Sequence, residues 1–249
     1  MKIRLDIYCV EKGLFETRHK AQAAIMAGMV LINGKKAQKA GESVRDTDIV
    51  ELAGEKCPYV SRGGLKLKAA IDYFHIDLNG KVCLDVGVAT GGFSDCMLKE
   101  GAAKVYGVDV GQGQLHEKLS GNKKFFFLPE TNARFLTADL FPEAPSFAAV
   151  DVSFISLKLI LIPLMSVLAE GGSAVLLVKP QFELSREFLR KGIVKDDNSR
   201  VSALKEIEDF IYKNVKNCRI EGYIDCPVKG SHGNREFLMK VSKKIKEGL

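Results

Sequence analysis

The chain has 249 residues, of which 46% are hydrophobic and 27% are charged, and its net charge at neutral pH is +6. This composition excludes a disordered, collagen-like or coiled-coil chain, and the modest positive charge permits a polyanionic partner without requiring one. Six scattered cysteines contain no C-x-x-C pair, so we expect neither a disulfide scaffold nor a metal site. The longest apolar run, residues 157–169, is too short for a membrane span, and the first residues lack an apolar leader. The sequence therefore predicts a cytoplasmic protein.

Residues 1–55 predict a small α+β domain of two helices followed by a small sheet. Thr17 is a good N-cap for the second helix, and Asn33-Gly34 is typical of a tight hairpin turn. The elements are expected, in chain order, at 3–12 and 18–27 for the helices, and at 29–32 and 48–52 for the strands. Pro58 and its neighbours interrupt any regular pattern, so residues 56–62 are interpreted as a linker.

Residues 63–249 alternate apolar strands with helical segments, the pattern of a doubly wound α/β sheet. Strands are expected at 82–86, 105–110, 125–128, 147–152 and 174–178, and helices at 63–73, 93–99, 114–119, 157–169 and 201–215. The last two strands, 219–226 and 236–241, flank a glycine-rich loop and predict an antiparallel hairpin with a reversed edge strand. Such a terminal hairpin is typical of Rossmann-like methyltransferases and is absent from most dehydrogenases.

A glycine-rich segment ends the first of these strands and opens the next helix, with glycines at Gly87, Gly91 and Gly92. Glycines allow a ligand to approach the backbone at a helix N-terminus. Their G-x-x-x-G-G spacing fits neither the dinucleotide pattern nor the P-loop. Asp85 suits an ammonium group, and Asp109, at the end of the second strand, suits ribose hydroxyls. These two ends describe S-adenosylmethionine, although the loop alone leaves open a glycine turn needed only for packing.

Six blocks in chain order resemble the TlyA family of ribosomal RNA 2′-O-methyltransferases, which have an FtsJ-like catalytic domain and are also named haemolysins. The blocks are VSRGGLKL (60–67), LDVGVATGGF (84–93), DVGQGQL (109–115), TNAR (131–134), DVSFIS (151–156) and VKPQFE (178–183). The resemblance implies S-adenosylmethionine as cofactor and a lysine–aspartate–lysine–glutamate tetrad at Lys66, Asp151, Lys179 and Glu236. It also implies cofactor contacts from Asp85, Gly87, Thr90, Gly91, Gly92, Phe93, Asp109, Asn132 and Asp151.

The implied reaction removes a proton from a ribose 2′-hydroxyl, which is a weak acid. By resemblance Lys179 is the base, a role that requires its neutral form. Lys66 and the cofactor's sulfonium favour that form, whereas the two carboxylates orient the lysines and oppose it. The residues alone leave rivals open, because Lys68 lies beside Lys66, and Glu183 and Glu221 compete with Glu236.

The N-terminal unit contains RLD (4–6), TR (17–18), Ala21, Ile25 and GMVLING (28–34). With these residues it resembles the small RNA-binding domain of the alpha-L type, first described in a small-subunit ribosomal protein. Residues 1–70 carry 13 basic and 8 acidic side chains, a net charge of +5, whereas residues 71–249 carry 24 and 23. A solvated basic face is the alternative interpretation. We expect RNA contacts from Arg4, Arg18, His19, Lys20, Lys35, Lys36 and Arg62.

The resemblance implies methylation of a cytidine ribose in 16S or 23S ribosomal RNA, with naked RNA or an assembled subunit as partner. Two alternatives are a ribosome-binding factor without catalytic turnover and a haemolysin-type membrane-active protein. The sequence leaves the oligomeric state open, with a monomer as the default.

Overall fold

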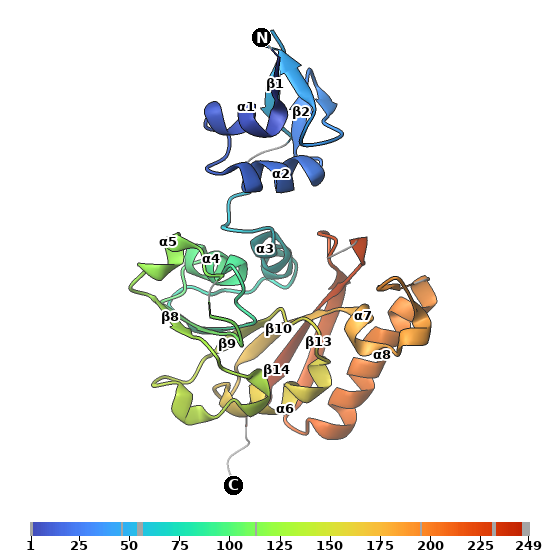
Figure 1. The fold of residues 1–249 in the computed structure, drawn as a ribbon. Coiled ribbons are helices and arrows are strands. Elements are labelled where there is room, and N and C mark those ends of the chain that lie inside the picture. The colour runs from blue at the N-terminus through green and yellow to red at the C-terminus, as the bar shows by residue number, and fades with distance from the viewer. Residues whose placement is uncertain are drawn as a thin grey trace. The chain divides into compact units, whose positions relative to one another are not determined.

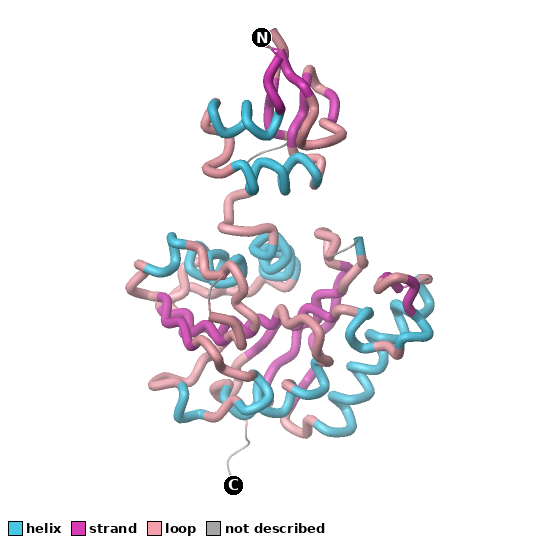
Figure 2. Tube along the Cα trace, in the orientation of Figure 1, coloured by secondary structure: helices cyan, strands magenta, loops and turns pink. Residues whose placement is uncertain are grey.

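The computed structural model describes residues 2–45, 47–53, 57–112, 114–194, 196–230 and 233–245. The chain divides into two compact units, 1–58 and 59–249. Residue 56, where the linker was expected to begin, lies outside the described ranges. Figures 1 and 2 show the elements of each unit. Within these ranges, no helix is both long enough and apolar enough to cross a membrane.

The N-terminal unit contains two helices and two small antiparallel sheets. Its elements are β1 (Lys2–Arg4), α1 (Leu5–Glu11), α2 (Arg18–Met26), β2 (Val30–Ile32), β3 (Lys35–Lys36), β4 (Ser43–Arg45) and β5 (Val50–Leu52). Strand β1 pairs with β4, and the second sheet has the order β3-β2-β5. Both helices contribute to a shared core that includes the fully buried side chains of Leu5, Cys9 and Val44.

Local signals in this unit are confirmed at two places and wrong at one. Thr17 caps α2 by accepting a hydrogen bond from the backbone N–H of Lys20 at 3.2 Å. Asn33 and Gly34 have φ angles of 49° and 75° and join β2 to β3 in a tight turn. The first helix begins at Leu5, two residues later than expected, because Lys2–Arg4 pairs with Ser43–Arg45 instead. That pairing is long-range and leaves no local signal.

The second unit is built on a seven-stranded sheet with the order β13-β14-β10-β9-β6-β7-β8. Its strands are β6 (Val82–Val86), β7 (Lys104–Val108), β8 (Phe125–Leu128), β9 (Phe147–Val150), β10 (Ser173–Val178), β13 (Cys218–Asp225) and β14 (Phe237–Lys243). Neighbouring strands from β10 to β8 are parallel, whereas β14 is antiparallel to both β10 and β13. The doubly wound sheet with a terminal antiparallel hairpin is therefore confirmed.

The expected edge position of the reversed strand is wrong. Strand β14 lies between β10 and β13, and β13 forms the edge. The burial of the two strands explains this order: β14 begins with three consecutive buried residues, Phe237, Leu238 and Met239, as a strand covered on both faces requires. In β13 less buried residues alternate with exposed ones, so this strand tolerates the edge.

Helices cover both faces of this sheet, and Figure 1 shows α3 and α4 on one face and α6 and α8 on the other. The helices are α3 (Gly63–Tyr73), α4 (Gly92–Lys99), α5 (Glu117–Ser120), α6 (Leu161–Val167), α7 (Pro180–Glu183) and α8 (Asp197–Asn214). Each face has its own apolar core: Leu67 and Met97 belong to one, Leu161 and Ile207 to the other. The architecture is a three-layer α/β fold.

The remaining differences concern the bounds of elements and several short elements. The helix expected at 157–169 is a 3₁₀ turn at Leu157–Leu159 followed by α6, and the helix expected at 114–119 is α5 at Glu117–Ser120. Between β8 and β9 the described chain forms only single 3₁₀ turns, at Ala133–Phe135 and Ala138–Leu140. A small hairpin of β11 (Leu189–Arg190) and β12 (Ile193–Val194) follows α7. Helix α8 begins four residues before the expected 201, because Asp196 caps it by accepting from the Ser199 N–H at 2.8 Å. Two- and three-residue elements of this kind carry too little periodicity to be predicted.

Candidate active site

The glycine loop between β6 and α4 is closely packed against its own chain. Gly87 and Gly91 have φ angles of 89° and 91°, a region that favours glycine. A Cβ atom on Gly87 would collide with the carbonyl oxygen of Asp151, and one on Gly92 would collide with the Ser61 hydroxyl. The glycines are therefore required by packing, so any fit to a ligand must rest on the cavities beside the loop.

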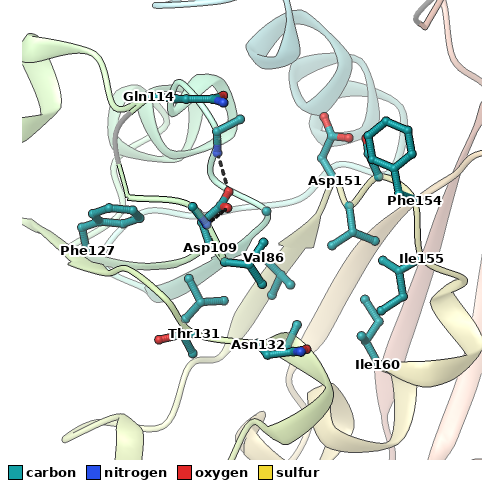
Figure 3. A pocket seen from close by; sticks show the side chains of 18 residues that line it. Val86, Asp109, Gln114, Phe127, Thr131, Asn132, Asp151, Phe154, Ile155 and Ile160 are labelled. Carbon is teal, nitrogen blue, oxygen red and sulfur yellow. Dashed lines mark hydrogen bonds between the residues drawn. The ribbon is translucent and has the colours of Figure 1, made fainter.

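The first cavity lies at the carboxyl ends of β6, β7 and β9 and has a volume of about 360 Å³. Asp109 is fixed at its wall: one carboxylate oxygen accepts from the Ala89 N–H and the other from the Gly111 N–H, both at 2.8 Å. Figure 3 shows Asp109 and Phe127 on one side and Asp151 and Phe154 on the other. A mostly apolar cavity with a carboxylate fixed at its wall by two backbone N–H groups fits a purine base joined to a ribose.

Among the expected cofactor residues, Gly87, Asp109, Asn132 and Asp151 line this first cavity. Asn132 accepts a hydrogen bond from the Arg134 N–H at 3.0 Å, so its side chain also caps the turn that follows β8. Four of the expected cofactor residues therefore share one cavity.

A second cavity of about 230 Å³ adjoins the first and shares Gly87, Ala89, Asp151 and Ser153 with it. The expected cofactor residues Thr90, Gly92 and Phe93 line it. All four members of the expected tetrad also line it, namely Lys66, Asp151, Lys179 and Glu236. The fold therefore brings together residues that lie up to 170 positions apart in the chain.

The tetrad is arranged as two ion pairs. Lys66 Nζ lies 2.6 Å from Glu236 Oε2, and Lys179 Nζ lies 2.6 Å from Asp151 Oδ1. Lys66 and Lys179 are each 8% exposed and Glu236 only 1%, so these charges are largely removed from water and their pairing offsets the cost. Lys179 also donates to the hydroxyl of Ser153 at 2.8 Å.

The rival residues lie in other environments. Lys68 pairs with Asp72 at the surface, at 2.5 Å. Glu183 accepts from the Leu157 N–H at 2.9 Å and so stabilises the turn after β9. Glu221 lies on β13, where it accepts from Ser242 at 2.7 Å. None of the three lines the cavity that holds the tetrad.

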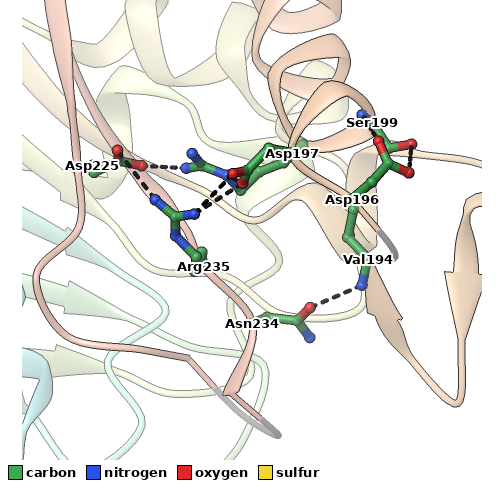
Figure 4. Close-up of polar contacts among 8 residues, drawn as sticks. Val194, Asp196, Asp197, Ser199, Asp225, Asn234 and Arg235 are labelled. Atoms are coloured by element: carbon green, nitrogen blue, oxygen red, sulfur yellow. Dashed lines mark hydrogen bonds and ion pairs between the residues drawn. The ribbon is translucent and has the colours of Figure 1, made fainter.

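The two residues before Glu236, Asn234 and Arg235, are held by polar contacts, which Figure 4 shows. The buried amide of Asn234 accepts from the Val194 N–H at 3.1 Å and donates to the Gly192 carbonyl at 3.0 Å. Arg235 donates to Asp197 at the start of α8, at 2.9 Å. These contacts hold the loop before β14 against the small hairpin and α8, and so fix the position of Glu236.

Asp85 is completely buried beneath the glycine loop and lines neither cavity. It accepts from the Ser94 hydroxyl at 2.6 Å, whereas its Oδ1 has no hydrogen-bond partner among the described residues. Burial raises the pKa of Asp85 to about 7. Gly91 likewise lies outside both cavities. In this structure, therefore, Asp85 is a buried carboxyl group with one oxygen that has no hydrogen-bond partner among the described residues.

Sequence reasoning missed Phe154 as a residue of the site. Its side chain is 92% exposed although it is aromatic, and its φ of 64° is unusual for a residue other than glycine. The ring lies 5.2 Å from the ring of Phe182, at the wall of the first cavity. The only available signal was its place three residues after Asp151.

The expected RNA-binding residues of the N-terminal unit differ in their environments. Arg4 and Arg18 both pair with the fully buried Asp6, at 3.0 and 2.9 Å, and the Arg4 guanidinium helps to hold the pKa of Asp6 well below its usual range. Lys20 pairs with Glu16. The two arginines therefore have a structural role besides any role in binding.

The other expected RNA-binding residues reach the surface more freely. Within the described part of the unit, Lys35 and Lys36 on β3 are exposed and have no acidic partner, and His19 is also exposed. Arg62 belongs to the second unit and lines a cleft of about 270 Å³ together with Lys66 and Lys229.

Comparison with known proteins identifies both units. The family of FtsJ-like methyltransferases matches residues 59–243, and the S4 domain matches residues 3–50. The Bacillus subtilis protein "Putative rRNA methyltransferase YqxC" is 44% identical over 243 residues, covering 96% of this chain and 85% of the relative.

Two further relatives extend this comparison. The "16S/23S rRNA (cytidine-2'-O)-methyltransferase TlyA" of Mycobacterium tuberculosis is 34% identical, covering 96% of this chain and 89% of its own. The solved structure "Putative hemolysin from Streptococcus thermophilus" is 41% identical with a TM-score of 0.78, covering 98% of this chain and 89% of that one. The chain therefore belongs to the FtsJ-like methyltransferase family, whose cofactor is S-adenosylmethionine, and carries an S4 domain at its N-terminus.

Proposed function

We propose that the protein transfers a methyl group from S-adenosylmethionine to the ribose 2′-hydroxyl of a cytidine in ribosomal RNA. The observation that supports this most strongly is the convergence of Lys66, Asp151, Lys179 and Glu236 on one cavity. This second cavity adjoins the first cavity, which is suited to a nucleoside. The name of the relative from Mycobacterium tuberculosis supplies the cytidine and the ribosomal RNA. A ribosomal substrate implies a cytoplasmic location.

The two cavities fit the two ends of the cofactor. The Asp109 carboxylate would accept hydrogen bonds from the ribose hydroxyls, and the apolar wall that includes Phe127 and Ile155 would hold the adenine. The loop from Gly87 to Phe93 would hold the amino-acid end, with the unsatisfied oxygen of Asp85 close beneath it. When bound, the cofactor supplies an electrophilic methyl group on a positively charged sulfur.

Lys179 would accept the proton of the attacking 2′-hydroxyl. Its 8% exposure and its contacts with Asp151 and Ser153 hold the amine at one point of the cavity. Lys66, held by Glu236, would donate to the reacting oxygen and favour its negative charge. The ring of Phe154, which is 92% exposed, would stack on the nucleobase whose ribose enters the cavity, because stacking would remove its apolar face from water.

The test is methyl transfer from labelled S-adenosylmethionine to 30S and 50S subunits and to their deproteinised RNA, followed by mapping of the modified ribose. Lys179→Ala should lower kcat by at least about a hundredfold, as expected for loss of a general base. Its affinity for S-adenosylmethionine should stay within about twofold of the wild-type value. Lys68→Ala, a lysine on the outer surface of α3, is the matched control and should retain full activity.

Three outcomes would contradict this proposal. Full activity of Lys179→Ala would reject this lysine as the base. A methyl group mapped to a base atom would reject the 2′-hydroxyl as acceptor. Absence of methyl transfer by the wild-type protein, with ribosome binding retained, would favour the non-catalytic factor.

A further inference from the structure

The hydroxyl of Ser153 is the second hydrogen-bond acceptor of Lys179. Its Oγ lies 2.8 Å from Lys179 Nζ, while Asp151 Oδ1 lies 2.6 Å from the same nitrogen. Ser153 lies two residues after Asp151 in the loop that follows β9, and it lines both cavities. Its hydroxyl therefore contacts the proposed base from a residue that both cavities share.

The two contacts of Lys179 determine the direction of the lone pair of its neutral amine. A neutral lysine amine has two N–H groups and one lone pair, arranged tetrahedrally with the bond to Cε. Two acceptors close to the nitrogen occupy the two N–H groups. The lone pair must then point in the one remaining direction. With a single acceptor, either N–H group could make the contact, and the lone pair could then point in either of two directions.

We propose that Ser153 is a positioning residue that, together with Asp151, fixes the lone pair of Lys179 toward the attacking 2′-hydroxyl. This inference rests on the proposed function of Lys179. In the step itself, the proton of the 2′-hydroxyl passes to Lys179 Nζ, and the ribose oxygen forms a bond to the methyl carbon as the bond from that carbon to sulfur breaks. Ser153 gains and loses no proton; it only accepts an N–H.

The surroundings of Lys179 Nζ provide two hydrogen-bond acceptors for it. The nitrogen lies 5.9 Å from the centre of the Phe182 ring, and the Lys66–Glu236 pair lines the same cavity. Among the described residues, only Asp151 and Ser153 are hydrogen-bond acceptors of Lys179 Nζ. Removal of the Ser153 hydroxyl therefore leaves Asp151 as the single acceptor.

The experiment compares Ser153→Ala with Ser153→Thr in the full-length protein, using 30S and 50S subunits and labelled S-adenosylmethionine. Ser153→Ala should lower kcat by at least about tenfold, whereas the affinity for S-adenosylmethionine and the KM for the subunits should stay within about twofold. Ser153→Thr keeps the hydroxyl and should recover most of kcat. Ser166→Ala is the matched control, because this serine lies on α6 and donates only to the Pro163 carbonyl.

A pH profile of kcat separates positioning from a merely structural role. An acceptor stabilises the protonated lysine more than the neutral one. The acid limb of the Ser153→Ala profile should therefore move to lower pH, while the plateau at high pH falls. If the hydroxyl instead donated to the lone pair, its removal would move the limb to higher pH.

Several results would overturn the inference. These are an unchanged kcat in Ser153→Ala, a limb that stays in place or moves to higher pH, or a failure of Ser153→Thr to recover activity. The proposed function is tested separately by Lys179→Ala. An inactive Lys179→Ala together with a fully active Ser153→Ala would reject only the role of Ser153.

Discussion

At the scale of single residues, Glu236 depends on a neighbour that has no side chain. Gly230 lies in the loop before β14, and a Cβ atom there would collide with Glu236 Oε1, the oxygen beside the one that binds Lys66. The backbone of Gly230 does not have a positive φ, so alanine is compatible with its conformation. The glycine therefore provides space for a carboxylate, and its role is not that of a flexible turn.

Gly230→Ala should push the Glu236 carboxylate away from Lys66 and lower kcat by at least about tenfold. The free energy of unfolding should fall by up to about 3–5 kcal/mol, because the displaced carboxylate leaves the buried Lys66 without its partner, so kcat is compared at a temperature at which both proteins are folded. Gly121→Ala is the control: its φ is −100° and a Cβ there meets nothing within 4 Å. Wild-type kcat in Gly230→Ala, measured by methyl transfer, would contradict the structural role of this glycine.

Asp85 should make the stability of the protein depend on pH. Its pKa is about 7 in the folded state because of burial, against about 3.9 in an unfolded chain. Between these values the folded state binds more protons than the unfolded state, so the contribution of Asp85 to stability falls as pH rises from 4 to 7. Asp85→Asn resembles the protonated form and removes this titration.

Denaturant unfolding of wild type and Asp85→Asn at pH 4.5 and 7.5 measures the effect. The difference in unfolding free energy between the two proteins should shift by roughly 2–4 kcal/mol in favour of the variant at the higher pH. A difference that stays constant would mean that Asp85 is ionised in the folded state across this range. The comparison between variants removes the contribution of the other carboxyl groups.

At the scale of elements, helices and strands with local sequence signals were predicted with the correct bounds, whereas those that depend on a partner distant in the sequence were not. Helix α3 and strands β6 and β8 have the predicted bounds, because their apolar runs and end signals are local. Strand β1 was predicted as helix because its partner, β4, lies about 40 residues away. The internal position of β14 could have been inferred from its consecutive apolar residues, which the hairpin pattern obscured.

The residues of the candidate site likewise divide into those that the sequence predicted and those that only the folded chain brings together. The four tetrad positions were assigned by resemblance, and the fold gathers them in one cavity. Composition and spacing alone would not have separated Lys66 from Lys68, which are two residues apart on one helix but face different surroundings. Ser153, Phe154 and Gly230 could not be predicted, because their roles depend on which side chains the folded loops bring near them.

At the scale of the whole molecule, the positive charge is unevenly distributed along the chain. Residues 1–70 carry a net +5 of the total +6. Part of that charge is used within the fold, since Arg4 and Arg18 stabilise the buried Asp6. Reversal of Arg18 would therefore disturb folding as well as binding. Lys35 and Lys36 on β3 are better probes of the S4 unit, because no described acidic side chain pairs with them.

Lys35→Glu combined with Lys36→Glu should weaken binding to 30S and 50S subunits and reduce its salt dependence. Each phosphate contact that is lost lowers the slope of log affinity against log salt concentration by roughly 0.7–0.9, so two lost contacts remove about 1.5. The affinity for S-adenosylmethionine and the cooperativity of unfolding should remain unchanged, because both lysines are exposed on the N-terminal unit.

The matched control reverses the same number of charges at Lys213 and Lys216. Both lysines are exposed and lie at and just beyond the C-terminus of α8. The start of β13 follows them, so they lie at the amino ends of the parallel strands, opposite the end that carries the active site. Binding titrations between 50 and 200 mM KCl would give the slope for each protein. Equal slopes for the two double variants would show that the effect comes from net charge alone. A lower slope confined to Lys35→Glu/Lys36→Glu would assign phosphate contacts to β3. The S4 unit would then bind the RNA on which the catalytic unit acts.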